Sequence, residues 1–387
     1  MIALPHKLLK EQASIRLVAL PDASHVRTPM GNWKSPLLEL SSWDVRAREA
    51  TASITAEIPS GVVLERFETL SQSGAALLEQ MLMTLVPRDH DRAAAAHFAR
   101  ITGGVLLHIK GRLAEPVVIE HAGSADRYRN TLIILEPGSE AVILERHIGK
   151  GRASHVVEIF AKENAHVSYA DVQELHGTLV IRKSALVERN ASITWCEIGA
   201  TRGTSVTRTL TRLAGEQANV SLHSLYLGDH EDVSDTGAEA LHEAEHTQSR
   251  LFTKGALAGS ARTTYEGILR IGAHAAKSSA FQEEHCLLLS EHADVKASPT
   301  LYIDNNDVQC SHAATAARPD AELLFYLQSR GLPVEEARRL LVKGFLWPVI
   351  ETLPARFNGA IAPIAETIID RFAGPSELAI AAGEDHA

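Results

Sequence analysis

A short motif recurs through the middle of this chain, and its spacing limits the folds the chain can adopt. Each copy has a polar residue, an alanine, any residue and then a β-branched residue, and the alanines at 141, 165, 191 and 218 are 24, 26 and 27 residues apart. Weaker copies occur at Ala261 and Ala293. A period in the twenties indicates a solenoid, because one such unit cannot bury its own apolar face and must stack on its neighbours. With about three short strands per unit and no helical stretch between them, a parallel β-helix fits best.

Two other folds are alternatives to the β-helix. A turn followed by alanine and a β-branched residue is also common where strands begin in a sandwich or barrel, so that alternative stays open. A leucine-rich repeat is disfavoured because its ladder of leucine and asparagine is missing.

The chain divides into three regions that differ in predicted secondary structure. Residues 1–100 are expected to be mainly helical, with loops and short elements in the proline-punctuated first 60 residues and a helical pattern from Gly61 to Arg100. Residues 101–318 form the expected β-helix core, which begins where Thr102-Gly103-Gly104 breaks the helical pattern. Residues 319–387 form a C-terminal helical module. The fold class is therefore mainly β, with helical regions on both sides of the solenoid.

The C-terminal module has clear helix boundaries. The first helix should begin at Pro319 and end at Arg330, with Gly331 as a left-handed stop, and the second should begin at Pro333. The second helix places an apolar stripe on one face, made of Ala337, Leu340, Leu341 and Phe345. The third helix has a stripe made of Ile361, Ile364, Ala365, Ile368, Ile369 and Phe372. We expect these stripes to pack within the module.

Composition limits the class of protein and its cellular location. The 387 residues are 45% hydrophobic, enough for one or two sizeable cores, and the net charge of -10 disfavours nucleic-acid binding. We find no signal peptide, and no run of about 18 apolar residues predicts a membrane helix. Three widely spaced cysteines argue against a disulfide framework and for a reducing, cytoplasmic location.

Cys310 and His312 form half of a candidate metal site. If Val308 to His312 is extended, the two side chains project from the same face of the strand. Thiolate and imidazole suit zinc, copper or iron–sulfur chemistry, but a closed site needs about four ligands. The missing ligands must come from elsewhere in the chain or from another chain.

Three other groups of residues are weaker candidates. His242, Glu243 and His246 match the letters of a zincin motif, yet they lie between strand-like runs. The run Glu283-Glu284-His285-Cys286 cannot converge on one ligand, because alternate side chains of a strand face opposite ways, and we interpret Cys286 as structural. Cys196 lies in a repeat strand, where a buried core position is expected.

The C-terminal part of the chain contains an ordered series of distinctive segments: Leu301-Tyr302-Ile303-Asp304, Asp307-Val308-Gln309-Cys310-Ser311-His312, Ala314-Thr315, Leu324-Phe325-Tyr326-Leu327 and Ser329-Arg330-Gly331. This series resembles the SufB/SufD family of the SufBCD iron–sulfur cluster assembly machinery. The resemblance runs with gaps from about Gly61 to Phe345, and Cys310-Ser311-His312 favours the SufD side of the family. The chain departs from the family pattern at Asn305-Asn306, where paired acids are usual, and at Ala313, where glycine is usual.

The resemblance implies a right-handed parallel β-helix between helical regions and a non-catalytic scaffold role. It implies pairing with a SufB-like subunit, with His312 and Cys310 at an interface site for iron or a transient iron–sulfur cluster shared with that partner. It also implies docking of a SufC-like ATPase on the C-terminal helices, for which we take the region of Gly331, Pro333, Leu341 and Phe345.

Three alternatives remain: a zinc hydrolase that uses His242, Glu243 and His246, a carbohydrate-active β-helix enzyme, and a protein that only stabilises its partner, as a chaperone does. The sequence leaves open whether the isolated chain forms a homodimer. It also leaves open which cluster type is built and whether the chain alone binds metal.

Overall fold

The computed structural model describes residues 5, 7–8, 11, 62–123 and 126–374. The loops and short elements expected before Gly61, and the end of the C-terminal module beyond Gly374, lie outside the described residues.

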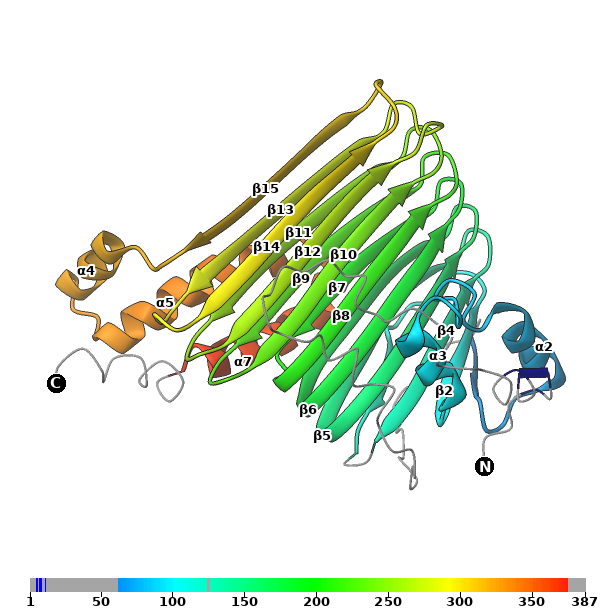
Figure 1. The fold of residues 1–387 in the computed structure, drawn as a ribbon, viewed down its shortest axis with the longest axis horizontal. Coiled ribbons are helices and arrows are strands. Elements are labelled where there is room, and N and C mark those ends of the chain that lie inside the picture. The colour runs from blue at the N-terminus through cyan, green and yellow to red at the C-terminus, as the bar shows by residue number, and fades with distance from the viewer. Residues whose placement is uncertain (1–4, 6, 9–10, 12–61, 124–125, 375–387) are drawn as a thin grey trace.

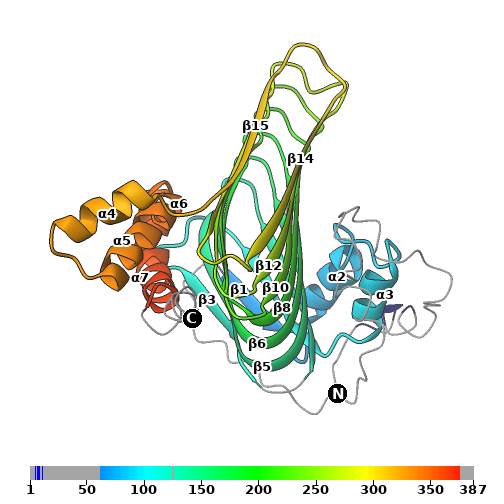
Figure 2. The ribbon, with the colours of Figure 1, turned by 60° about the vertical axis from the view of Figure 1, so that its left-hand side comes forward.

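The described residues form a parallel β-solenoid of about eight turns, built from two facing sheets (Figures 1 and 2). Sheet 1 contains β1 (Val62–Arg66), β2 (Gly103–Ile109), β4 (Arg127–Leu135), β8 (Arg202–Leu213), β10 (Val233–His242), β12 (Arg262–Ile271) and β14 (Asp294–Ile303). Sheet 2 contains β3 (Val117–His121), β7 (Ser192–Gly199), β9 (Asn219–Gly228), β11 (Gln248–Leu257), β13 (Ser279–Leu288) and β15 (Gln309–Ala317).

Two long strands join the sheets. β5 (Glu140–Ala161) and β6 (His166–Val187) each place their first half in sheet 2 and their second half in sheet 1. All strand pairs are parallel except β1 with β2. The β-helix prediction is confirmed, but each turn has two long strands and not the expected three short ones.

The repeated motif marks one corner of the solenoid. The polar residue of each true copy has a left-handed backbone, with φ of 59° at Asn164, 55° at Asn190 and 62° at Gln217. The alanine that follows stacks on the next turn, as the hydrogen bond from Ser192 N to Ala165 O (2.9 Å) shows. Asparagine tolerates this conformation better than most side chains, which explains the composition of the motif.

Three copies of the motif were placed wrongly. Ala141 pairs with Val167 inside the strands, and Ser139 occupies the corner in its place, since His166 N donates to Ser139 O (2.8 Å). The first true spacing, from 139 to 165, is therefore 26 residues. Ala261 and Ala293 belong to the opposite corner, where Asp294 N donates to Ala261 O (3.0 Å).

A second corner depends on glycine. Gly151, Gly177 and Gly203 pair in register on three successive turns. Gly177 has a φ of +136°, and a Cβ added there would lie 2.1 Å from Gly151 O. Only glycine fits this stack, because neither the conformation nor the space admits a side chain.

The N-terminal helices α2 (Gln72–Met81) and α3 (Arg92–Ala99) pack on the outer face of sheet 1 (Figure 2). Asp91 caps α3 by accepting from Ala94 N (2.7 Å) and also pairs with Arg182 (2.8 Å) in β6. The helical pattern predicted from Gly61 is wrong for its first residues, since Val62–Arg66 is strand β1, antiparallel to β2. Pairing along the open edge of sheet 1 outweighs the helical spacing there.

The C-terminal helices are α4 (Ala321–Ser329), α5 (Val334–Leu346), α6 (Pro348–Glu351) and α7 (Ala355–Phe372). The apolar face of α5 to α7 covers the outer face of sheet 2, so the stripes pack on the solenoid and not only within the module (Figure 2). The α7 stripe is confirmed, with Ile361, Ala365 and Phe372 buried. The α5 stripe is wrong in part, because Leu340 is 51% exposed while Val342 is buried. No helix in the described ranges is long and apolar enough to span a membrane.

Candidate functional site

The last two strands leave the C-terminal end of the solenoid open. β15 pairs only with β13 and β14 only with β12, so within the described residues each has one free edge (Figure 1). Large apolar side chains are exposed on β14, with Tyr302 46% and Ile303 44% accessible. Free edges of this kind present unpaired backbone groups to which another chain can bind.

Cys310 and His312 lie on β15, on the face that continues the interior of the solenoid. They pair with Ala280 and Gln282 of β13, both buried and inward-facing, so the predicted shared face is confirmed. Cys310 is half-buried against the interior apolar cluster, whereas His312 is exposed. Burial raises the pKa of the Cys310 thiol, although a backbone hydrogen bond with Ala280 acts the other way. A metal would have to displace that proton.

Cys310 and His312 supply only two of the about four ligands that a closed metal site needs. Among the described residues, the one cluster of three possible ligands lies elsewhere, at His121, His147 and His155. His312 makes no hydrogen bond or ion pair to any described residue. Its coordination capacity therefore remains available to a partner, while the roles of both residues remain predictions.

The interior of the solenoid carries a row of buried charged side chains that the sequence did not predict. Lys183 is fully buried and lies 2.7 Å from Asp171 Oδ2 and 2.8 Å from Glu197 Oε1. Burial opposes the charge on this lysine, but the two carboxylates raise its pKa. The lysine therefore stays protonated inside the fold.

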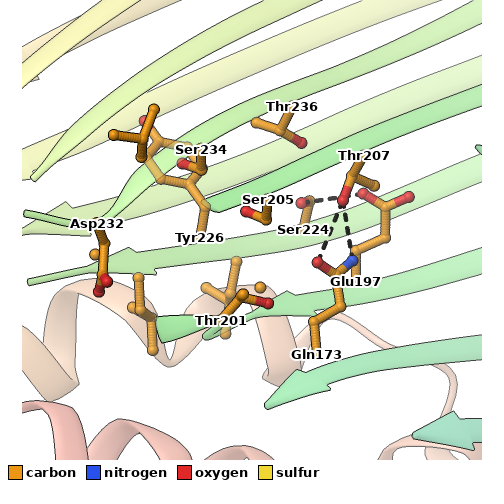
Figure 3. A pocket seen from close by; sticks show the side chains of 15 residues that line it. Gln173, Glu197, Thr201, Ser205, Thr207, Ser224, Tyr226, Asp232, Ser234 and Thr236 are labelled. Carbon is orange, nitrogen blue, oxygen red and sulfur yellow. Dashed lines mark hydrogen bonds between the residues drawn. The ribbon is translucent and has the colours of Figure 1, made fainter. Parts of the chain in front are cut away.

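A small cavity adjoins this row (Figure 3). Its volume is about 20 Å³, which suits roughly one water molecule. Thr207 bonds the amide of Gln173 (3.1 Å), and Ser224 donates to Glu197 Oε2 (3.3 Å). The cavity is too small for anything larger than a water molecule, so we assign no other ligand to it.

The histidine cluster lies nearer the N-terminal end of the same interior. Burial lowers the pKa of His121 to about 4 and holds the pKa of His147 well below its usual range, so both rings are neutral near pH 7. A signal for the cluster existed in the sequence: His121 and His147 are 26 residues apart, which is one turn of the repeat. His155 has no such signal, because it comes from the facing sheet.

The run Glu283-Glu284-His285-Cys286 alternates as predicted. Glu284 and Cys286 are buried and point inward, where Tyr226 donates a hydrogen bond to Glu284. His285 points outward and bonds Thr315 (2.8 Å). Burial raises the pKa of Glu284 to about 7 and that of Cys286 to about 12, so this thiol is unreactive. Cys196 is also buried, beneath the C-terminal helices.

The zincin match is not a zinc site. His242 ends strand β10, and His246 is a left-handed corner residue with φ of 59°, so the pair does not lie on one helix. Both ring nitrogens of His242 are already bonded, to Thr247 and Ser249 at 2.8 Å each. Glu243 pairs with Arg212 at 3.0 Å. The three side chains therefore lack the geometry that the hydrolase alternative requires.

The region expected to dock an ATPase is a helical hairpin of α4 and α5. Gly331 ends α4 with φ of +96° and Pro333 caps α5, while Leu341 is half-buried. Phe345 is held to sheet 2, since Lys254 Nζ lies 2.7 Å from its carbonyl and 4.5 Å from its ring centroid. The exposed large apolar side chains of the hairpin are others: Leu323, Phe325, Tyr326, Val334 and Leu340.

Fold and site together define a parallel β-solenoid with a charged interior, helices on its outer faces and an open strand edge at one end. The model of the family "SUF system FeS cluster assembly, SufBD core domain" matches residues 118–345. That range is more than half of the 387 residues. The chain therefore belongs to the SufBD core domain family of iron–sulfur cluster assembly proteins.

Relatives agree with this assignment. The chain is 29% identical over 308 residues to "Iron-sulfur cluster assembly protein SufD" of Bacillus subtilis, a match that covers 76% of this chain and 70% of the relative. It is 24% identical over 319 residues to the SufBD family protein slr0074 of Synechocystis, covering 77% of this chain and 66% of the relative. A SufBD family protein of Mycobacterium leprae, ML0593, is 32% identical over 242 residues, which are 60% of this chain and 27% of that protein. The resemblance found in the sequence is confirmed.

Proposed function

We propose that this chain is a non-catalytic scaffold subunit of a cytoplasmic iron–sulfur assembly complex and pairs with a SufB-like subunit through its open strand end. The observation that carries the proposal is the half-site on a free edge. Cys310 and His312 share one face of β15, whose other edge has no strand partner among the described residues. A partner strand added there would bring further ligands to the same face and complete a site for iron or a transient cluster.

The C-terminal helices support the second part of the proposal, docking of a SufC-like ATPase. The hairpin around Gly331 and Pro333 exposes apolar side chains, with Phe325 73% and Tyr326 54% accessible. Several exposed apolar side chains on one hairpin are typical of a protein interface. Leu341 and Phe345 contribute less exposed surface, and Phe345 packs against the solenoid.

The enzyme alternatives have weaker support. The zincin residues do not converge, and a cavity of about 20 Å³ is too small for a sugar ring.

The test is to express the full chain with its SufB-like and SufC-like counterparts and to measure complex formation and cluster content. We expect one stable complex, with His312→Ala reducing cluster formation at least about tenfold while the complex stays intact. Ser311→Ala is the matched control, because Ser311 faces the opposite side of the same strand. The pairing proposal fails if the chain forms only a homodimer, and the ligand role fails if His312→Ala assembles clusters like the control.

A further inference from the structure

Three histidines from three strand segments meet inside the first turns of the solenoid. His121 ends β3, and its register partner His147 lies one turn further in sheet 2. His155 reaches the same point from sheet 1, in the second half of β5. One ligand atom from each ring can be chosen so that all three lie within 4.8 Å of one another, and each side chain is at most 3% exposed.

The rings are packed as a group. The centroids of His121 and His147 are 5.0 Å apart and nearly parallel, and His155 lies 4.5 Å and 4.8 Å from them. Four ligands around a tetrahedral zinc ion with metal–nitrogen bonds of about 2.05 Å are ~3.4 Å apart. The cluster would therefore contract by about 1.4 Å at its widest pair, a shift within reach of small side-chain rotations.

Two ring nitrogens in this cluster lack a hydrogen bond. Within the described residues, neither His121 Nδ1 nor His147 Nε2 has a hydrogen-bond partner. The nearest acidic oxygen to His147 Nε2 is Asp171 Oδ1 at 3.4 Å, which is itself without a hydrogen bond. Buried polar atoms are normally satisfied, so two unpaired ring nitrogens within one buried cluster indicate a missing ligand.

A carboxylate contacts two of the three rings. Glu145 Oε1 lies 3.0 Å from His155 Nε2, accepts from Thr131 (2.6 Å) and also contacts His121 Nε2. Its second oxygen accepts from Tyr169. Two buried arginines lower the pKa of the rings, since Arg129 acts on His121 and Arg127 acts on His147, while the carboxylate of Glu145 raises the pKa of both.

We propose that His121, His147 and His155 together bind one divalent transition-metal ion of the Zn²⁺ or Fe²⁺ class. The carboxylate of Glu145 completes the set of four ligands, and Thr131 and Tyr169 orient that carboxylate. Three imidazoles favour these ions over Mg²⁺ or Ca²⁺, which prefer ligand sets made of oxygen atoms. The ion joins the two sheets across the interior. This site is separate from Cys310 and His312 and does not depend on the proposed function.

The test uses the full chain and zinc or cobalt alone. Because the ligands are buried, the protein is refolded from denaturant with the metal present and then dialysed against a weak chelator. We expect one equivalent of retained metal and a higher melting temperature than that of the metal-free protein. Magnesium should give neither effect.

Variants locate the ion. His147→Gln should lower zinc affinity by more than the roughly 10–100-fold that loss of a hydrogen-bond partner to a metal ligand causes. His312→Ala should leave the affinity unchanged, which separates this site from the open edge. Anomalous diffraction from wild-type crystals grown with zinc gives a readout that survives misfolding of any variant. A peak between His121 and His155 supports the proposal. Absence of stoichiometric metal, a peak elsewhere, or unchanged affinity in folded His147→Gln would overturn it.

Discussion

Lys183→Met offers the sharpest test of the charged interior. The lysine is fully buried between two carboxylates, at 2.7 Å from Asp171 and 2.8 Å from Glu197. Methionine has a similar shape, so packing changes little, but both acids lose their counter-charge. Breaking a buried ion pair by removing one partner costs about 3–5 kcal/mol, because the remaining charge stays buried and unpaired.

The assay is denaturant unfolding of the full chain at pH 7, with the unfolding free energies of wild type and variant compared. Lys183→Met should be destabilised by about 3–5 kcal/mol. The triple variant that also carries Asp171→Asn and Glu197→Gln should regain most of this loss, because no charge is left unpaired. A loss under ~1 kcal/mol in Lys183→Met, typical of an exposed pair, would refute the reasoning and show that water reaches the interior.

Three further predictions concern other parts of the fold. Burial raises the pKa of Glu284 from 4.5 to about 7, so the folded state keeps this proton to higher pH than the unfolded chain does. Unfolding free energy should therefore fall by ~3 kcal/mol as pH rises from about 4.5 to 7. Unfolding curves for Glu284→Gln should lack this component, and parallel profiles would contradict the assignment. Gly177→Ala should destabilise the protein by at least ~2 kcal/mol, since the added Cβ would lie 2.1 Å from Gly151 O. Gly359→Ala in α7 is the control and should stabilise the protein by ~0.5–1 kcal/mol. Equal melting temperatures of the two variants would count against the glycine stack. Phe325→Asp should weaken binding of a SufC-like ATPase by ~2 kcal/mol in calorimetry, and an unchanged affinity would remove the hairpin from the interface.

The accuracy of the sequence prediction follows the range of the interactions involved. The corner at Asn164-Ala165 was readable because a left-handed residue and a small residue are local requirements. Ala141 satisfied the same pattern by chance inside a strand, and only the pairing with Val167 reveals this. Gly61 to Arg66 looked helical because spacing carries no information about an unpaired sheet edge nearby.

The candidate sites show the same division. The shared face of Cys310 and His312 follows from strand alternation alone, and the alternation of Glu284 and His285 was predicted on that basis. The exposed hairpin residues Phe325 and Leu340 were not predicted, because which side of a helix is covered depends on where it packs.

The sequence by itself determined the solenoid and its period, since both follow from a local pattern that repeats along the chain. It also determined the family, through an ordered series of segments near the C-terminus. Only the tertiary structure decided what lies inside. His121, His147 and His155 become neighbours because β5 turns from sheet 2 into sheet 1, so residues eight positions apart face each other across the interior. Stacking turns brings distant charges such as Lys183 and Glu197 together in the same way. The partners of these buried side chains are set by the strand register and by the way the two sheets face each other. Neither the register nor the facing of the sheets can be predicted from one segment alone.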